Sequence, residues 1–84
     1  MPVKFKYKKM PVKYNIVEVI SVDDATSEYE KIINREPLYN VLKVSCIIKT
    51  DDGRMFEKTE YFLEPVWEDV KRIGYYVAYE DYYE

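Results

Sequence analysis

The dipeptide Asp52-Gly53 is the strongest constraint on how this 84-residue chain can fold. Aspartate followed by glycine favours a two-residue turn, because both turn positions need a positive φ. The flanking residues 38–63 are rich in β-branched and aromatic side chains, so we predict a β-hairpin over this range. The remaining elements must be arranged around this antiparallel pair.

The length of the turn decides which side chains share a face of the hairpin. A two-residue loop pairs Ile48 with Glu57 and Val44 with Tyr61, and makes this the core face. A three-residue loop would move each residue of the second strand to the other face. With the two-residue loop, an apolar patch lies on the open face of the sheet. Its members are Ile47, Phe56 and Phe62.

Helices are predicted on both sides of the hairpin. The first begins after Asp23-Asp24, whose carboxylates accept hydrogen bonds from unpaired N–H groups, and it ends before Pro37. The second begins at Glu64-Pro65, with proline in its favoured first position, and ends at Gly74. Both segments place apolar residues at the spacing of one buried helical stripe.

Three further segments are predicted to be strands, over residues 3–8, 14–22 and 75–79. The first alternates apolar residues with lysines between Pro2 and Pro11, which is typical of an edge strand. The resulting order is a β-α-β-β-α-β unit preceded by one extra edge strand. We therefore expect a single α+β domain over residues 1–84, a ferredoxin-like sandwich with both helices on one face of a mostly antiparallel sheet.

Missing residue types restrict the chemistry of the chain. It has no histidine and one cysteine, Cys46, so histidine-based catalysis and a disulfide within the chain are excluded. We expect no enzymatic activity, no cofactor and no metal site. No apolar run is long enough to span a membrane. The single cysteine and the absence of a secretory signal in these residues favour a reducing, cytoplasmic setting. Abundant Lys, Glu and Tyr without Gln fit a thermophile, and an AT-rich genome explains them equally well.

The last ten residues, Tyr75 to Glu84, hold five tyrosines, three acids and no base. Tyrosine joins an apolar ring to a polar tip, which suits interfaces. Alternation after Gly74 predicts that residues 75–79 form a last strand with Tyr75, Val77 and Tyr79 packed inward. The candidate partner-binding residues of this tail are Tyr76, Glu80, Asp81, Tyr82, Tyr83 and Glu84.

The leading hypothesis for function is a small protein-interaction module. It would dock on a protein with a basic surface, or pair with itself as a homodimer, as a regulator or inhibitor encoded by a virus or mobile element. The alternative is an RNA- or single-strand-binding module that uses Phe56, Phe62 and the N-terminal lysines. The net charge of −3, and Glu60 between the two phenylalanines, disfavour nucleic acid. The lysines concerned are Lys4, Lys6, Lys8, Lys9 and Lys13.

Overall fold

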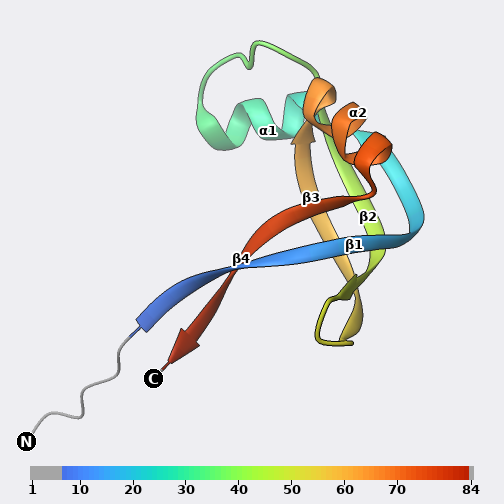
Figure 1. The fold of residues 1–84 in the computed structure, drawn as a ribbon. Coiled ribbons are helices and arrows are strands. Elements are labelled where there is room, and N and C mark those ends of the chain that lie inside the picture. Colours follow the sequence, from blue (N-terminus) through green and yellow to red (C-terminus); the bar gives the residue numbers. More distant parts are fainter. Residues whose placement is uncertain (1–6, 84) are drawn as a thin grey trace, which may run out of the picture.

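Four antiparallel strands form one curled sheet with two helices in the part of the chain that the structure describes (Figure 1). The structure is a computed structural model that describes residues 7–83, with side chains for residues 8–82. The strand order is β3-β2-β1-β4. The elements are β1 (Tyr7–Asp24), α1 (Thr26–Ile33), β2 (Val41–Thr50), β3 (Met55–Leu63), α2 (Glu64–Ile73) and β4 (Tyr75–Tyr83).

The strand β1 is 18 residues long and has two partners on opposite sides. Its first half pairs with β4 from Tyr7 to Asn15, and its second half pairs with β2 from Tyr14 to Asp24. Pro11 does not separate two strands as predicted, because it lies opposite Tyr79 on a stretch that β2 does not reach. The predicted strand over residues 3–8 lies mostly outside the described residues.

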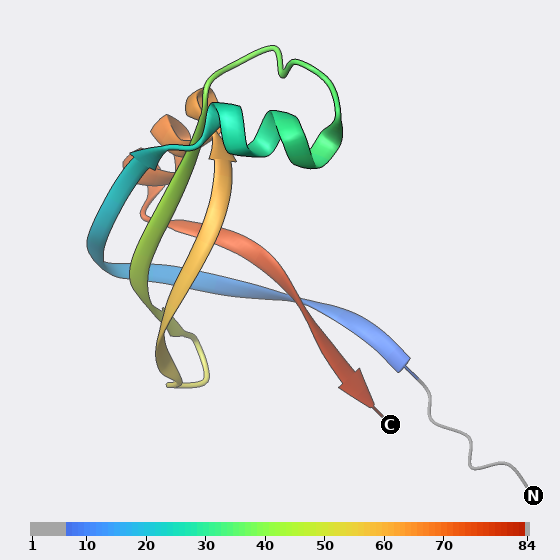
Figure 2. The same ribbon diagram turned by 180° about the vertical axis from the view of Figure 1, so that it is seen from behind.

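The first half of β1 and β4 form a two-stranded ribbon that leaves the rest of the molecule. We call residues 7–13 and 77–83 the arm. Both views show the arm running away from the helices toward the two chain ends (Figures 1 and 2). It contributes to a longest molecular dimension of 48 Å. Both strand edges of the arm are therefore distant from α1 and α2.

The α+β class and the antiparallel sheet are confirmed, but the ferredoxin-like order is not. In that order the strands flanking a helix are parallel and separated by a third strand. Here β1 and β2 are direct antiparallel neighbours.

The prediction that both helices cover one face is wrong. Trp67 of α2 packs against Val44 on one face of β2. Tyr29 of α1 lies 5.7 Å, between ring centroids, from Tyr61 of β3, on the opposite face. Figure 2 shows α1 in front of the sheet, with α2 behind it. Each helix thus covers a different side of the β2–β3 pair.

The hairpin turn has three residues, so the predicted two-residue register is wrong. The Thr50 N–H donates to the Arg54 carbonyl over 2.9 Å, and the Gly53 N–H donates to the Thr50 carbonyl over 3.0 Å. Gly53 has φ of +93°, the left-handed residue that follows a turn in three-residue hairpins. The Thr50 hydroxyl also accepts the Arg54 N–H and donates to Asp52, which favours the longer loop. Ile48 consequently pairs with Phe56.

The new register turns two phenylalanine rings toward the interior. Phe56 meets the Tyr14 ring edge-on at 5.5 Å between centroids. Phe62 stacks on Trp67 at 5.5 Å and meets the Tyr76 ring at 5.1 Å. These contacts join β3 to β4 across the concave side of the curled sheet. They lie over a buried floor of Tyr14, Val44, Cys46, Ile48, Trp67 and Val70.

Candidate protein-interaction edge

The predicted open-face patch does not come together. Phe56 and Phe62 pack against the core clusters on the concave side. Ile47 pairs with Glu57, and therefore lies on the opposite face of the hairpin. The cause is the three-residue turn, which changes the face of every β3 residue relative to β2.

Of the predicted tail residues, Tyr76 belongs to the interior. Its ring contacts those of Tyr14 and Phe62. Its hydroxyl is buried and has no hydrogen-bond partner among the described residues. Burial, followed by the charge of Glu60, raises the Tyr76 pKa above its ordinary value of 10. Tyr76 is therefore a packing residue of the concave side.

Glu80 holds β4 to the start of β3. It receives bonds from the Tyr14 hydroxyl (2.6 Å) and from both terminal nitrogens of Arg54 (3.1 and 2.9 Å). The bonds from Arg54, then the bond from Tyr14, lower the Glu80 pKa below its ordinary 4.5. Burial and the bond to Glu80 raise the Tyr14 pKa to about 12. The Glu80 carboxylate therefore links β4 to Tyr14 and Arg54 across the concave side, and its partners lie within the chain.

The other predicted tail residues lie toward the end of the arm. Asp81 is opposite Lys9 on β1, with 3.9 Å between its Oδ1 and the Lys9 Nζ. Tyr82 is opposite Lys8. Tyr83 is described by its backbone, which pairs with Tyr7. Glu84 lies outside the described residues. The acids of β4 are therefore neighbours of cations rather than an isolated anionic surface.

The side of β4 that faces away from β1, which we call the outer edge of β4, ends the sheet in the described residues. The Ile16 N–H donates to the Gly74 carbonyl over 2.9 Å, and β1 and β4 then pair without a register shift to Tyr7 and Tyr83. Successive backbone N–H groups alternate between the two sides of a strand. The N–H and C=O groups of Val77 and Tyr79 therefore point outward, along the outer edge.

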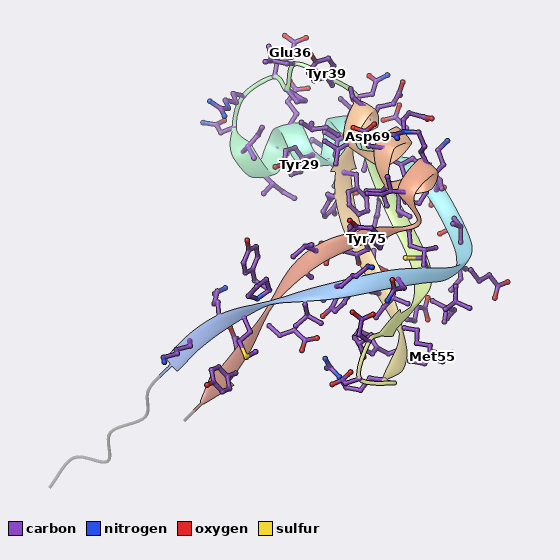
Figure 3. All side chains as sticks on the ribbon, in the orientation of Figure 1. Tyr29, Glu36, Tyr39, Met55, Asp69 and Tyr75 are labelled. Atoms are coloured by element: carbon purple, nitrogen blue, oxygen red, sulfur yellow. The ribbon has the colours of Figure 1, made fainter. Side chains whose placement is uncertain are left out.

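The side chains next to these outward groups are exposed. Tyr79 is 66% exposed and Val77 is 51% exposed, so their predicted inward packing is wrong. Both lie on the same face of the arm as Lys13, whose ammonium is 4.3 Å from the Tyr75 ring centre. Figure 3 labels Tyr75 at the base of the arm. Tyrosines occupy both faces of β4, so alternation in the sequence could not tell the inward set from the outward set.

A second stretch of strand edge lies on β1, where β4 no longer reaches. We call Val17–Asp24, on the side away from β2, the outer edge of β1. Its ladder with β2 shifts register twice, so Val17 and Ile20 are inserted residues of β-bulges. Val17, Val19, Ile20 and Val22 are all exposed. Bulges twist a strand and disturb the alternation that an added strand needs, so they protect such an edge.

The structure also has grooves between residues of the described range 8–82. A groove of about 470 Å³ lies between the arm and the β2–β3 turn, and its lining includes Arg54, whose guanidinium donates to the carboxylates of Asp52 and Glu80. Within residues 7–83, no group of acids and thiols is placed to hold a metal ion. Neither helix in this range is long and apolar enough to cross a membrane.

The chain matches no protein-family model, no curated protein and no solved structure. The geometry of the chain itself is therefore the only guide to a functional site. That geometry favours the outer edge of β4, where outward backbone groups and exposed apolar side chains occur together.

Proposed function

We propose that this chain is a non-enzymatic protein-interaction module that binds an extended segment of a partner along the outer edge of β4. One observation carries the proposal. The nine residues of β4 pair with β1 without a bulge, and their other side ends the sheet in the described residues. Adding a strand to such an edge is a recurring mode of peptide recognition.

The composition of β4 supports binding rather than protection. Exposed edges are usually guarded by charged side chains, above all lysine, by proline or by a bulge. Residues 75–83 contain neither lysine nor proline, their ladder is regular, and their two acids, Glu80 and Asp81, have Arg54 and Lys9 of the same chain as partners. Backbone hydrogen bonds would supply affinity, and Val77 and Tyr79 would supply apolar contacts beside them. A tyrosine ring adds contact area at a low cost in side-chain entropy.

The ionised groups of the concave side support a binding role over catalysis. A general acid that works near neutral pH needs a raised carboxyl pKa. Hydrogen bonds from Arg54 and Tyr14 lower the pKa of Glu80, and hydrogen bonds from Thr50 and Arg54 lower the pKa of Asp52. These two carboxylates are therefore tuned to remain charged and to hold the hairpin turn and the arm together.

The nucleic-acid alternative has less geometric support. Base stacking needs aromatic rings that lie open on a sheet surface. Phe62 stacks on Trp67, and Phe56 meets Tyr14 edge-on within the concave side. Both rings would have to leave the core before a base could stack on them.

A displayed library of random peptides, selected on the immobilised chain, tests the proposed function. We expect enriched peptides that favour extended structure, and we expect them to bind wild type and Val77→Ala but not Val77→Pro. Proline removes the outward N–H of Val77, and alanine is the control for loss of the side chain. Selection that yields no binder, or binders that tolerate Val77→Pro, would contradict the proposal. A labelled oligonucleotide that binds at low salt and that no selected peptide displaces would support the nucleic-acid alternative instead.

A further inference from the structure

We infer that the segment added to β4 is β4 of a second copy of this chain, antiparallel about a two-fold axis through the Tyr79 pair. This inference rests on the proposed function, because it uses the same outer edge. It names the partner and the register. The sequence Tyr-Tyr-Val-Ala-Tyr-Glu-Asp-Tyr-Tyr of β4 begins and ends with a tyrosine pair around a central tyrosine. In a symmetric antiparallel pairing, the tyrosine pair at the start of one β4 therefore lies opposite the tyrosine pair at the end of the other.

Backbone geometry restricts the registers that are possible. Outward N–H and C=O groups come from the odd-numbered residues, because Ile16 bonds Gly74 and the ladder continues without a shift. Two copies can exchange hydrogen bonds only where an outward residue lies opposite an outward residue. Tyr79 opposite Tyr79 of the second copy meets this condition, and it places Val77 opposite Asp81. If one strand is displaced by a single residue, outward residues lie opposite inward residues, and these hydrogen bonds cannot form.

Two criteria distinguish the remaining symmetric registers: whether acids lie opposite one another, and how much of β4 is paired. An axis at Glu80 places that acid opposite itself, and an axis at Asp81 does the same for Asp81. Like charges directly opposite one another destabilise a strand pair. An axis at Ala78 leaves the last two residues of β4 beyond the start of the other β4. The Tyr79 axis pairs the whole strand and places Glu80 opposite Ala78, so no acid lies opposite an acid.

The position of the arm allows a second copy to approach. Figures 1 and 2 show β4 running away from both helices, so two arms can lie side by side with the helical parts of the two copies apart. The interface is isologous, since the same surface serves both copies. Its centre brings together two Tyr79 side chains, each 66% exposed in the single chain. Pairing would bury them and would join the two sheets into one.

Light scattering after size exclusion, across a concentration series, tests this inference on the full chain. We expect wild type to reach the mass of two chains. Tyr79→Ala should still dimerise, with weaker affinity because the ring is lost. Tyr79→Pro lacks the same ring and also the outward N–H, so its affinity should fall by a further factor of about ten or more. The circular dichroism and thermal unfolding of the two variants serve as the check that both are folded.

A cysteine at the axis gives a second, independent test. Hydrogen-bonded antiparallel pairs have Cα atoms about 5.5 Å apart, within the range of a disulfide. Cys46 is buried, so Tyr79→Cys carries one accessible thiol. Mild oxidation should convert Tyr79→Cys to a covalent dimer much faster than Val19→Cys, the matched control on the outer edge of β1.

The outcomes separate this inference from the proposed function. A wild-type monomer at all concentrations that still binds selected peptides overturns the self-pairing and leaves the peptide site standing. A dimer that persists in Tyr79→Pro, or that links equally fast through Val19→Cys, places the contact elsewhere and also overturns it. A monomer that binds no peptide contradicts both proposals.

Discussion

The outer edges of β1 and β4 both carry exposed apolar side chains, and neither has a partner strand in the described residues, but their backbones differ. The outer edge of β1 has bulges at Val17 and Ile20, whereas β4 pairs in one unbroken register. Under the proposed function, exposed apolar side chains alone are not enough for a strand edge to bind another strand. The regularity of the backbone beside them decides whether another strand can be added.

The two edges differ because β1 serves two partners. It must turn from β4 to β2 within one strand, and bulges are the usual means of bending a strand. The bend curls the sheet so that Phe62 of β3 reaches Tyr76 of β4. The register shifts thus lie in the ladder between β1 and β2, and the ladder between β1 and β4 has none.

The largest expected effect comes from removing Trp67, the anchor of α2, which lines a small cavity together with Val19 of the outer edge of β1. Trp67 is 2% exposed and packs with Val44, Val70 and Phe62. We expect Trp67→Ala to reduce the free energy of unfolding by about 3–5 kcal/mol, measured by urea denaturation. Val66→Ala on the exposed face of α2 is the control. Equal losses in both variants would show that α2 is not held to the sheet as described.

An opposite and smaller effect is expected from the inward tyrosine of β4. The Tyr76 hydroxyl is buried and has no partner among the described residues. Because an unpaired buried polar group costs about 1–3 kcal/mol, Tyr76→Phe should raise the free energy of unfolding by about 1 kcal/mol. Tyr75→Phe should leave it nearly unchanged. Loss of stability in Tyr76→Phe would mean that the hydroxyl has a partner, and would weaken the assignment of inward and outward residues.

Acid should loosen the attachment of β4 to β3. The folded-state pKa of Glu80 is lowered by its bonds from Arg54 and Tyr14. A lowered folded pKa stabilises the fold above the unfolded-state pKa, and this contribution is lost as pH falls through the folded pKa. Denaturation of wild type and Glu80→Gln at several pH values below neutral should show a steeper acid loss for wild type. Glu30→Gln on α1 should behave as wild type, and parallel curves for all three would refute the role of Glu80.

The smallest effect on folding is expected from charged residues introduced at the two edges. These substitutions also give the most specific test of the β4–β4 register. Val77→Glu and Val19→Glu should each change the free energy of unfolding by less than about 0.5 kcal/mol, because both sites are exposed. Val77→Glu places an acid opposite Asp81 of the second copy and should weaken the dimer, by about 0.2–1 kcal/mol for each such pair. Val77→Lys should not weaken it. Equal behaviour of Val77→Glu and Val77→Lys in sedimentation equilibrium would reject the Tyr79-centred register.

Local signals in the sequence predicted most elements, and long-range pairing explains the errors. Pro37, Pro65 and Gly74 mark the ends of helices correctly, since backbone restrictions act within a few residues. The hairpin was placed correctly, but its register depended on one additional loop residue around Gly53. The continuity of β1 through Pro11 could not be predicted locally, because it depends on which strands lie alongside.

The composition of the tyrosine tail points to β4, but not to the faces of its residues. Tyr76 and Glu80, both candidates from the sequence, have partners within the fold. The exposure of Val77 and Tyr79 depends on how β4 pairs with β1. When tyrosines occupy both faces of a strand, neither composition nor spacing tells which alternate residues face inward.

Amide hydrogen exchange along β4, measured residue by residue at low and high protein concentration, tests the central claim most directly. We predict slow exchange at Tyr76 and Ala78 at both concentrations, because their N–H groups bond to β1. The outward amides of Val77 and Tyr79 should exchange fast in dilute protein and slow markedly as concentration rises. Fast exchange at Tyr79 at every concentration would contradict the β4–β4 pairing, and slow exchange there in dilute protein would contradict the open outer edge itself.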